Sequence, residues 1–249
     1  MSHTLPPSLL DLERAAMDVI KIMKAVPDLA KQKVAVIGGL ALWNFMPRGR
    51  STEDVDFIIT LDGPKSVKPK LLALKNSPFV ERAQFFFYKS PSGALVQIDF
   101  VGQFQAAYFP PTAVTVRDIS PGTIPYISVD DLIVFKIFSC GLRSEVSKSR
   151  RDALDAFRLL EQKTRASGPL RLSKHQIDAV VPGLNDVVRL TNNDDAWWKN
   201  RLGLSMTTSS NPGSKQPSGH GATGSGRGTA APGQSHQGHR GTGPANRYR

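Results

Sequence analysis

The sequence predicts an α+β fold in which a small mixed β-sheet, flanked by helices, is followed by a helical C-terminal part and a disordered tail. Two observations support this prediction. Short β-branched runs alternate with helical patterns up to residue 127, and only helical patterns follow from Ser128 to residue 204. The last segment, residues 205–249, is rich in glycine and serine and has almost no large apolar side chains, so it cannot form a packed core.

The elements of the first half follow from apolar spacing and from glycine and proline breaks. Leu9 to Met23 repeats apolar residues at helical spacing, so the chain begins with an amphipathic helix. Further helices are expected at 40–46 and 67–76, and strands at 33–37, 54–60, 80–88 and 94–101, with weaker strands at 112–117 and 124–127. Residues 1–127 are therefore expected to form the sheet-containing domain with its N-terminal helix.

The second half contains only helical patterns. Ser128 with Asp131, and Ser149 with Asp152, each form a capping-box pattern, which marks two helix starts. Residues 128–204 are therefore expected to form a helical part that completes any site on the sheet. Residues 205–249 are expected to form a Gly/Ser-rich basic tail.

Composition and charge restrict the possible partners and cellular location of the protein. The formal net charge is +11, and the segment from Met206 onward has five basic residues and no acidic ones. That tail is either a plain solvated segment or a weak contact for RNA or another polyanion. The single cysteine, Cys140, excludes an internal disulfide and indicates a reducing compartment. Because we find no signal peptide and no apolar run of about 18 residues, we expect no membrane partner and a cytoplasmic or nuclear location.

Asp54 and Asp56 are the strongest chemical feature of the sequence. They lie one residue apart at the start of the apolar strand 54–60, so both side chains point to the same face. Two like charges at that separation disfavour joint ionisation. A divalent cation that prefers oxygen ligands, Mg²⁺ or Mn²⁺, removes this penalty. The pair therefore predicts a metal site that acts on a nucleotide.

Asp99 is the third candidate ligand. Ile98 and Phe100 take the opposite face of strand 94–101, so Asp99 points away from that apolar stripe, as Asp54 and Asp56 do on their own strand. If the two strands pair, three carboxylates converge, and the third could also take a proton from an attacking hydroxyl. The alternative is a solvent-facing Asp99 on a half-exposed sheet.

Four further positions upstream of the acidic pair suit phosphate binding. Gly38-Gly39 lies where a strand gives way to a helix, so backbone N–H groups there could approach a phosphate. A tight turn without a binding role would use the same pair. Arg50 could contact phosphate and Thr52 could bond within the site, or both could be ordinary loop residues.

Lys136 lies in a run, 132–140, that is apolar on nearly every side, which indicates a buried helix. A buried lysine needs a partner, and the candidates are a triphosphate, Asp152 and Asp155. A side chain that reaches the surface is the alternative. Arg151 and Asp155 have the spacing of an i,i+4 salt bridge.

The run from Val36 through Gly38-Gly39 to Asp54-Val55-Asp56 resembles the opening motif of the nucleotidyltransferase fold, that of the DNA polymerase beta superfamily. In that motif a Gly-Gly or Gly-Ser pair is followed by a short helix and then by Asp-x-Asp. Here Asp54 follows Gly39 by 15 residues, which suits the motif. One departure is Gly39 itself, where many relatives have serine, so that one hydroxyl contact to phosphate is lost.

Later positions extend the resemblance, which covers residues 30 to 162. Asp99 matches the third carboxylate of the superfamily. Lys136, Asp152 and Asp155 resemble the helical Lys, Arg-x-Asp and Asp motifs of the AbiEii-like branch, known from abortive-infection toxins.

The resemblance implies a metal-dependent nucleotidyltransferase, which moves a nucleoside monophosphate from an NTP to an acceptor hydroxyl and releases pyrophosphate. It implies Mg²⁺ or Mn²⁺ on Asp54, Asp56 and Asp99. The residues that it implies for nucleotide binding are Gly38, Gly39, Arg50, Thr52, Lys136, Asp152 and Asp155. The acceptor is an RNA end, a protein hydroxyl or a small molecule, and neither its identity nor the oligomeric state follows from the sequence. A basic patch at Arg143, Lys148 and Arg150 could meet phosphates or an RNA acceptor.

Three other functions fit parts of the sequence. In a sugar transferase Asp-x-Asp also binds a metal and a nucleotide-sugar, although the upstream Gly-Gly and the later motifs argue against it. A catalytically silent protein of the same fold could bind nucleotide, RNA or a protein partner, although the intact acidic triad argues against it. The triad could also be incidental in an ordinary α+β domain.

Overall fold

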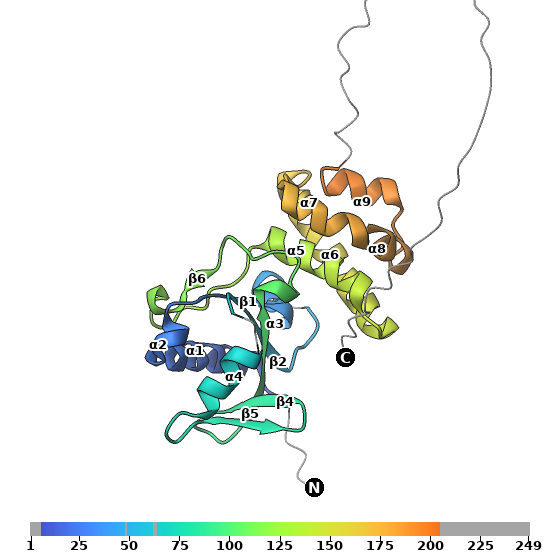
Figure 1. Cartoon of the computed structure of the whole chain (residues 1–249). Coiled ribbons are helices and arrows are strands. Elements are labelled where there is room, and N and C mark those ends of the chain that lie inside the picture. Colours follow the sequence, from blue (N-terminus) through green and yellow to red (C-terminus); the bar gives the residue numbers. More distant parts are fainter. Residues whose placement is uncertain (1–5, 48, 62–63, 205–249) are drawn as a thin grey trace, which may run out of the picture. The chain divides into compact units, whose positions relative to one another are not determined.

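The computed structural model describes residues 6–47, 49–61 and 64–204 (Figure 1). The predicted tail, 205–249, lies outside the described residues. The helices are α1 Leu9–Ala25, α2 Pro27–Ala30, α3 Gly38–Phe45, α4 Pro64–Leu72, α5 Val129–Leu142, α6 Val146–Ser167, α7 Lys174–Val180, α8 Leu184–Leu190 and α9 Asp195–Arg201. The strands are β1 Lys33–Ile37, β2 Asp54–Ile59, β3 Phe79–Arg82, β4 Phe85–Lys89, β5 Leu95–Gly102 and β6 Val114–Thr115. The predicted α+β fold is confirmed.

The strands form one mixed sheet in the order β3-β4-β5-β2-β1-β6. The central pair, β2 and β5, is parallel, and the other pairs are antiparallel. In the β2–β5 register, Asp56 lies opposite Asp99 and Asp54 lies opposite Gln97. Because side chains alternate along a strand, this register places the three aspartates on one face of the sheet.

Each face of the sheet is covered by its own apolar core. The odd-numbered residues of β2, among them Val55 and Phe57, pack into a core formed with α1 and α4. The even-numbered Ile58 packs into the second core, formed with α3, α5 and α6. The aspartate face is therefore covered by helices, and Asp99 is only partly exposed rather than on a bare surface.

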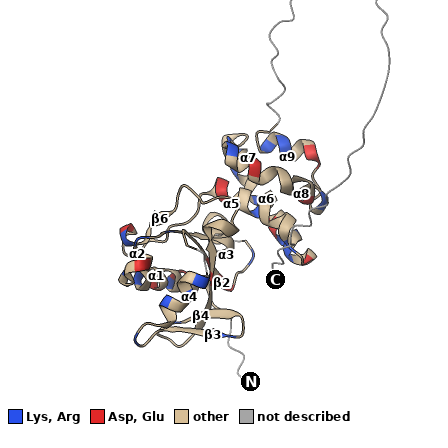
Figure 2. Ribbon diagram, in the orientation of Figure 1, with Lys and Arg blue, Asp and Glu red and all other residues tan. Residues whose placement is uncertain are grey.

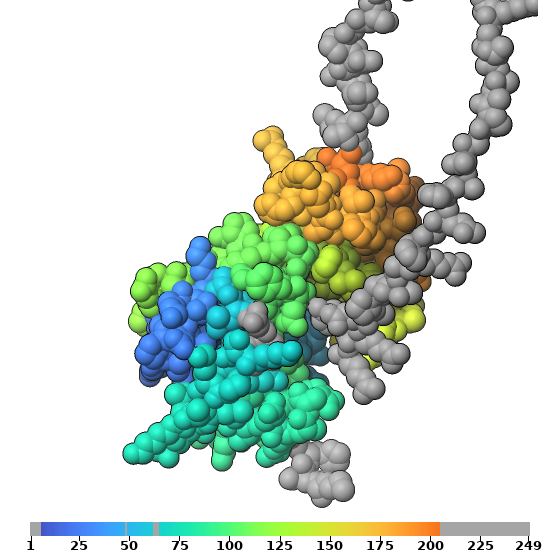
Figure 3. Space-filling model, in the orientation of Figure 1, coloured from blue at the N-terminus to red at the C-terminus, as the bar shows by residue number. Residues whose placement is uncertain are grey.

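The helical half packs around α5, which is buried on nearly all sides, as its apolar sequence predicts. The Trp198 side chain on α9 is fully buried in the same core as α5 and α6. In the space-filling view, α7 to α9 (orange) lie at one end of the described part and β4 (teal) lies toward the other (Figure 3). No helix among the described residues is both long and apolar enough to cross a membrane.

Four predicted features differ from the structure. The strand expected at 80–88 is a hairpin of β3 and β4, which turns at Ala83 with φ at +52°. The strands expected at 112–117 and 124–127 are reduced to two residues in β6 and to one bridge at Tyr126. Ser149 does not begin a helix, because α6 begins three residues earlier, and its buried hydroxyl donates a 2.7 Å hydrogen bond to the Cys140 carbonyl. By contrast, Ser128 caps α5 as predicted.

Candidate functional site

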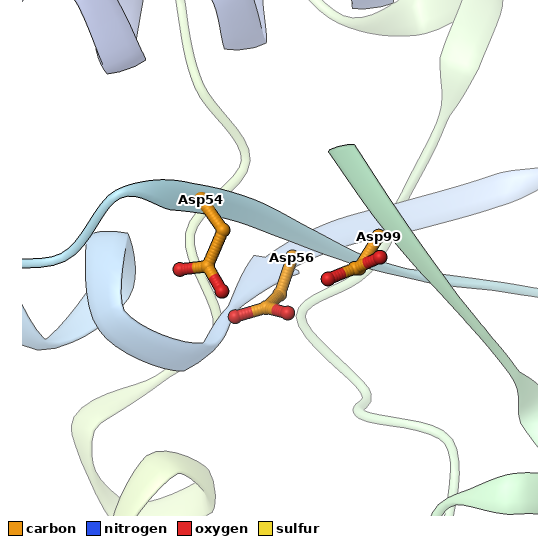
Figure 4. Close-up of side chains that lie close together, drawn as sticks. All are labelled: Asp54, Asp56 and Asp99. Atoms are coloured by element: carbon orange, nitrogen blue, oxygen red, sulfur yellow. The ribbon is translucent and has the colours of Figure 1, made fainter. Parts of the chain in front are cut away.

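Asp54, Asp56 and Asp99 converge on one point of the sheet, at the end where α3 begins. Figure 4 shows the three carboxylates pointing to the same side of β2 and β5. One carboxylate oxygen from each residue lies within 4.8 Å of the other two. The sequence thus identified the three side chains that this fold brings together.

The acidity of this cluster is strongly perturbed. Burial, together with the charges of Asp54 and Asp99, raises the pKa of Asp56 to about 8, although Lys136 and Arg143 act in the opposite direction. Burial also raises the pKa of Asp99, with Asp54 adding to the shift. Without a cation, Asp56 therefore keeps its proton at neutral pH, because burial and the two neighbouring carboxylates both disfavour its ionised form.

Two neighbouring polar side chains fix the outer carboxylates. The Thr52 hydroxyl donates a 2.6 Å hydrogen bond to Asp54 Oδ1. The Gln97 amide donates a 2.7 Å hydrogen bond to Asp99 Oδ2. Each hydrogen bond restrains the carboxylate that accepts it, which is how second-sphere hydrogen bonds position metal ligands.

The Gly-Gly pair is required by close packing against the site. Gly38 has φ at +68°, which favours glycine, and a Cβ there would overlap Asp56 Oδ2. A Cβ on Gly39 would overlap Thr52 Oγ1 and would lie 2.5 Å from Thr52 Cβ. The space that a serine side chain would need at position 39 is thus taken by Thr52. No side chain caps the start of α3, so its first N–H groups are open to an anion.

Lys136 is the centre of a buried ion-pair network. Its ammonium lies 2.7 Å from Asp152 Oδ1 and 3.0 Å from Asp155 Oδ2. Arg143 binds the second oxygen of Asp152 at 2.9 Å, and Arg50 binds Asp155 at 3.0 Å. Burial opposes ionisation of Asp152, but Lys136 and Arg143 hold its pKa below the ordinary value. With three cations and two carboxylates, the network has one excess positive charge.

The ion pairs show which residues contact Lys136 and Asp155. Of the candidates for Lys136, the structure supplies Asp152 and Asp155. The expected i,i+4 salt bridge between Arg151 and Asp155 is wrong, because Asp155 is buried and its carboxylate faces Arg50 and Lys136. Arg50 connects the segment before β2 to α6 through its salt bridge with Asp155. A nucleotide-binding role for these residues stays a prediction.

Sequence reasoning missed one polar residue that the structure places in the site, Gln97. One weak indication of this position was present in the sequence, because Gln97 lies two residues before Asp99 and so shares a face of the strand with it. Which atoms it contacts could not be read from spacing alone.

The aspartate cluster fits a divalent metal. It offers three carboxylate oxygens close together, and oxygen donors suit Mg²⁺ or Mn²⁺. The pKa of Asp56 is raised first by burial and then by the two neighbouring carboxylates, and a bound cation would oppose both effects.

Comparison with known proteins was made through family models, curated sequences and solved structures. No family model and no curated protein matches the chain. An antigenic nucleotidyltransferase-like protein from Paracoccidioides brasiliensis is similar in structure, with a TM-score of 0.53 and 17% identity over 80% of this chain and 96% of that one. The chain has a nucleotidyltransferase-like fold.

Two further solved structures are less similar to this chain. The antibiotic-resistance factor ANT(2'')-Ia has a TM-score of 0.30 and 14% identity, over 77% of this chain and 95% of that one. The Thermotoga maritima CCA-adding enzyme, solved with tRNA, has a TM-score of 0.28 and 11% identity, over 78% of this chain and 54% of that one. At these TM-scores neither structure supports an argument about this chain.

Proposed function

We propose that this protein is a metal-dependent nucleotidyltransferase, which moves a nucleoside monophosphate from an NTP to an acceptor hydroxyl and releases pyrophosphate. The convergence of Asp54, Asp56 and Asp99 within 4.8 Å, beside a helix start that no side chain caps, is the observation that supports it most strongly. The nucleotidyltransferase-like fold supports it independently.

In this proposal the triphosphate lies over the start of α3. No side chain caps the start of α3, so phosphate oxygens could approach the first N–H groups of the helix. The excess positive charge of the Lys136 network lies near enough to Asp56 to influence its pKa, and it would also attract the triphosphate. Arg50 and Lys136 would attract it while remaining paired with their carboxylates.

Asp54, Asp56 and Asp99 would bind Mg²⁺ or Mn²⁺, which supplies charge neutralisation at the attacking and leaving oxygens. Thr52 and Gln97 hold Asp54 and Asp99 in the orientation that this requires. Asp99, on β5, would accept the proton of the attacking hydroxyl. The helical part, 128–204, would complete the site through Lys136, Asp152 and Asp155, as in the AbiEii-like branch that these positions resemble.

Product formation from labelled NTPs tests this proposal. Each of the four NTPs, labelled at the α-phosphate, is incubated with Mg²⁺ and either total RNA or cell lysate, and labelled products are identified by mass spectrometry. We expect label transfer and pyrophosphate release by the wild type, and loss of both in Asp54→Asn and Asp99→Asn. The control, Asp118→Asn, changes an exposed carboxylate remote from the cluster and should behave as wild type. Equal transfer by the Asp54 variant and the wild type would refute the assignment.

A further inference from the structure

An open groove with basic walls lies along the first half of α6. It has a volume of about 570 Å³. Its walls include Arg50, Arg150, Arg151, Arg158, Val146 and Leu154. On α6, Val146, Arg150, Leu154 and Arg158 recur every four positions and Arg151 lies next to Arg150, so these residues line one side of the helix. Figure 2 shows basic residues at this end of α6.

The charge of this groove is poorly compensated. The carboxylate that lines it, Asp155, is already paired with Arg50 and Lys136. Within the described part of the chain, Arg150, Arg151 and Arg158 take part in no salt bridge, and all three are exposed. A stripe of three exposed arginines without a partner attracts a polyanion rather than a neutral ligand.

The groove borders the Lys136 ion-pair network, because Arg50 and Asp155 on its wall both belong to that network, and the charge of Lys136 acts on Asp56. Arg50, on its wall, comes four residues before Asp54, and Thr52 between them is hydrogen-bonded to Asp54. Arg143, at the end of α5, joins the same network through Asp152. A ligand bound along α6 would therefore lie beside the ion-pair network whose charge acts on Asp56.

We propose that this groove binds the backbone of a single-stranded RNA whose 3′-hydroxyl is the acceptor of the nucleotide. This inference rests on the proposed function, since it names the acceptor class of that site. In the transfer, the 3′-oxygen bonds to the α-phosphorus, the bond from that phosphorus to the bridging oxygen breaks, and pyrophosphate leaves. The hydroxyl proton passes to Asp99.

Three features favour RNA over an acidic protein. The basic side chains on the stripe are all arginines, whose forked guanidinium matches phosphate oxygens in a bidentate way. The apolar Val146, which is 72% exposed, and Leu154 lie between them and offer surface to a ribose or a base. An acceptor bound in this groove beside the Lys136 network needs both a row of phosphates for the arginines and a terminal hydroxyl for the transfer, and RNA carries both.

Binding of RNA without nucleotide or metal tests the groove directly. Fluorescence anisotropy with a 3′-hydroxyl oligoribonucleotide of about 12 nucleotides is measured on the full chain over a range of salt concentrations. The groove variant is Arg150→Gln/Arg151→Gln/Arg158→Gln. The matched control, Lys75→Gln/Arg82→Gln/Lys89→Gln, makes the same charge change at exposed positions around β3 and β4. A second titration measures Mg²⁺–NTP binding to all three proteins by calorimetry.

We expect the groove variant to bind RNA on the order of tenfold more weakly at low salt, and its salt slope to fall by about 2, at about 0.7 per phosphate contact. The control should keep the wild-type slope, and Mg²⁺–NTP affinity should be the same in all three proteins. An equal loss in both triple variants, or no RNA binding by the wild type, would overturn the inference. So would a selective loss of NTP affinity in the groove variant, which would make the groove a triphosphate subsite, or stronger binding of a polyglutamate peptide than of RNA. Failure of the proposed function would appear differently, as intact RNA binding without label transfer.

Discussion

The close packing of Gly39 against Thr52 gives a specific prediction for Gly39→Ala. Alanine has the higher helix propensity, but its methyl group would overlap Thr52. Gly39→Ala places a methyl group 2.5 Å from Thr52 Cβ and 3.2 Å from its Cγ2, in addition to the overlap with Oγ1. Alanine in place of glycine would by itself stabilise a helix by up to about 1 kcal/mol. Overpacking of a close contact costs about 1–3 kcal/mol, and displacing Thr52 from Asp54 costs about 1 kcal/mol more. We therefore expect a net loss of about 1–3 kcal/mol.

Chemical denaturation of a double-mutant cycle tests this reasoning. Thr52→Gly removes the three atoms nearest to the new methyl group, so it should make Gly39→Ala neutral or stabilising. Thr52→Ala keeps the Cβ at 2.5 Å and should rescue only in part. The single variant Gly39→Ala should also bind Mn²⁺ about 10–100-fold more weakly, since Asp54 loses its hydrogen-bond donor. A Gly39→Ala protein as stable as wild type, or an equal loss with Thr52→Gly present, would refute the account.

Three other predictions follow from the site. Lys136→Met should cost about 3–5 kcal/mol in denaturant unfolding, because two buried carboxylates lose their shared cation, whereas Lys174→Met on the surface should change little. In EDTA, the pKa of Asp56 is raised to about 8, so the folded state binds more protons than the unfolded one, and stability should fall as pH rises from about 4 to about 8. Asp56→Asn should remove most of this dependence, and a wild type whose stability rises over that range would contradict the raised pKa. Gln97→Ala should weaken metal binding about 10–100-fold while leaving kcat at saturating metal nearly unchanged. A variant that needs no more metal than the wild type would show that Gln97 does not position Asp99.

The acidic cluster was predictable because it depends on one simple rule. Alternation along β2 places Asp54 and Asp56 on one face, and pairing with β5 was enough to bring in Asp99. The buried state of Lys136 was equally predictable, because α5 is apolar on nearly all sides.

Other features depend on contacts between distant segments and could not be read from spacing. The run at 80–88 has no glycine or proline to mark the turn at Ala83, so a hairpin looked like one strand. Ser149 fits a capping pattern, but packing of α6 on α5 buries it and its hydroxyl bonds to Cys140 instead. The fit of Thr52 against Gly39 and the pairing of Arg50 with Asp155 likewise exist only once the chain has folded.

Binding of Mn²⁺, followed by electron paramagnetic resonance with and without an NTP, tests most directly whether the three aspartates form a metal site for nucleotide transfer. The account predicts that the wild type binds Mn²⁺ and binds it more tightly with NTP present. Asp56→Asn should lose this binding, whereas Asp118→Asn should retain it. Equal Mn²⁺ affinity in the wild type and Asp56→Asn, or no effect of NTP on either, would contradict the account.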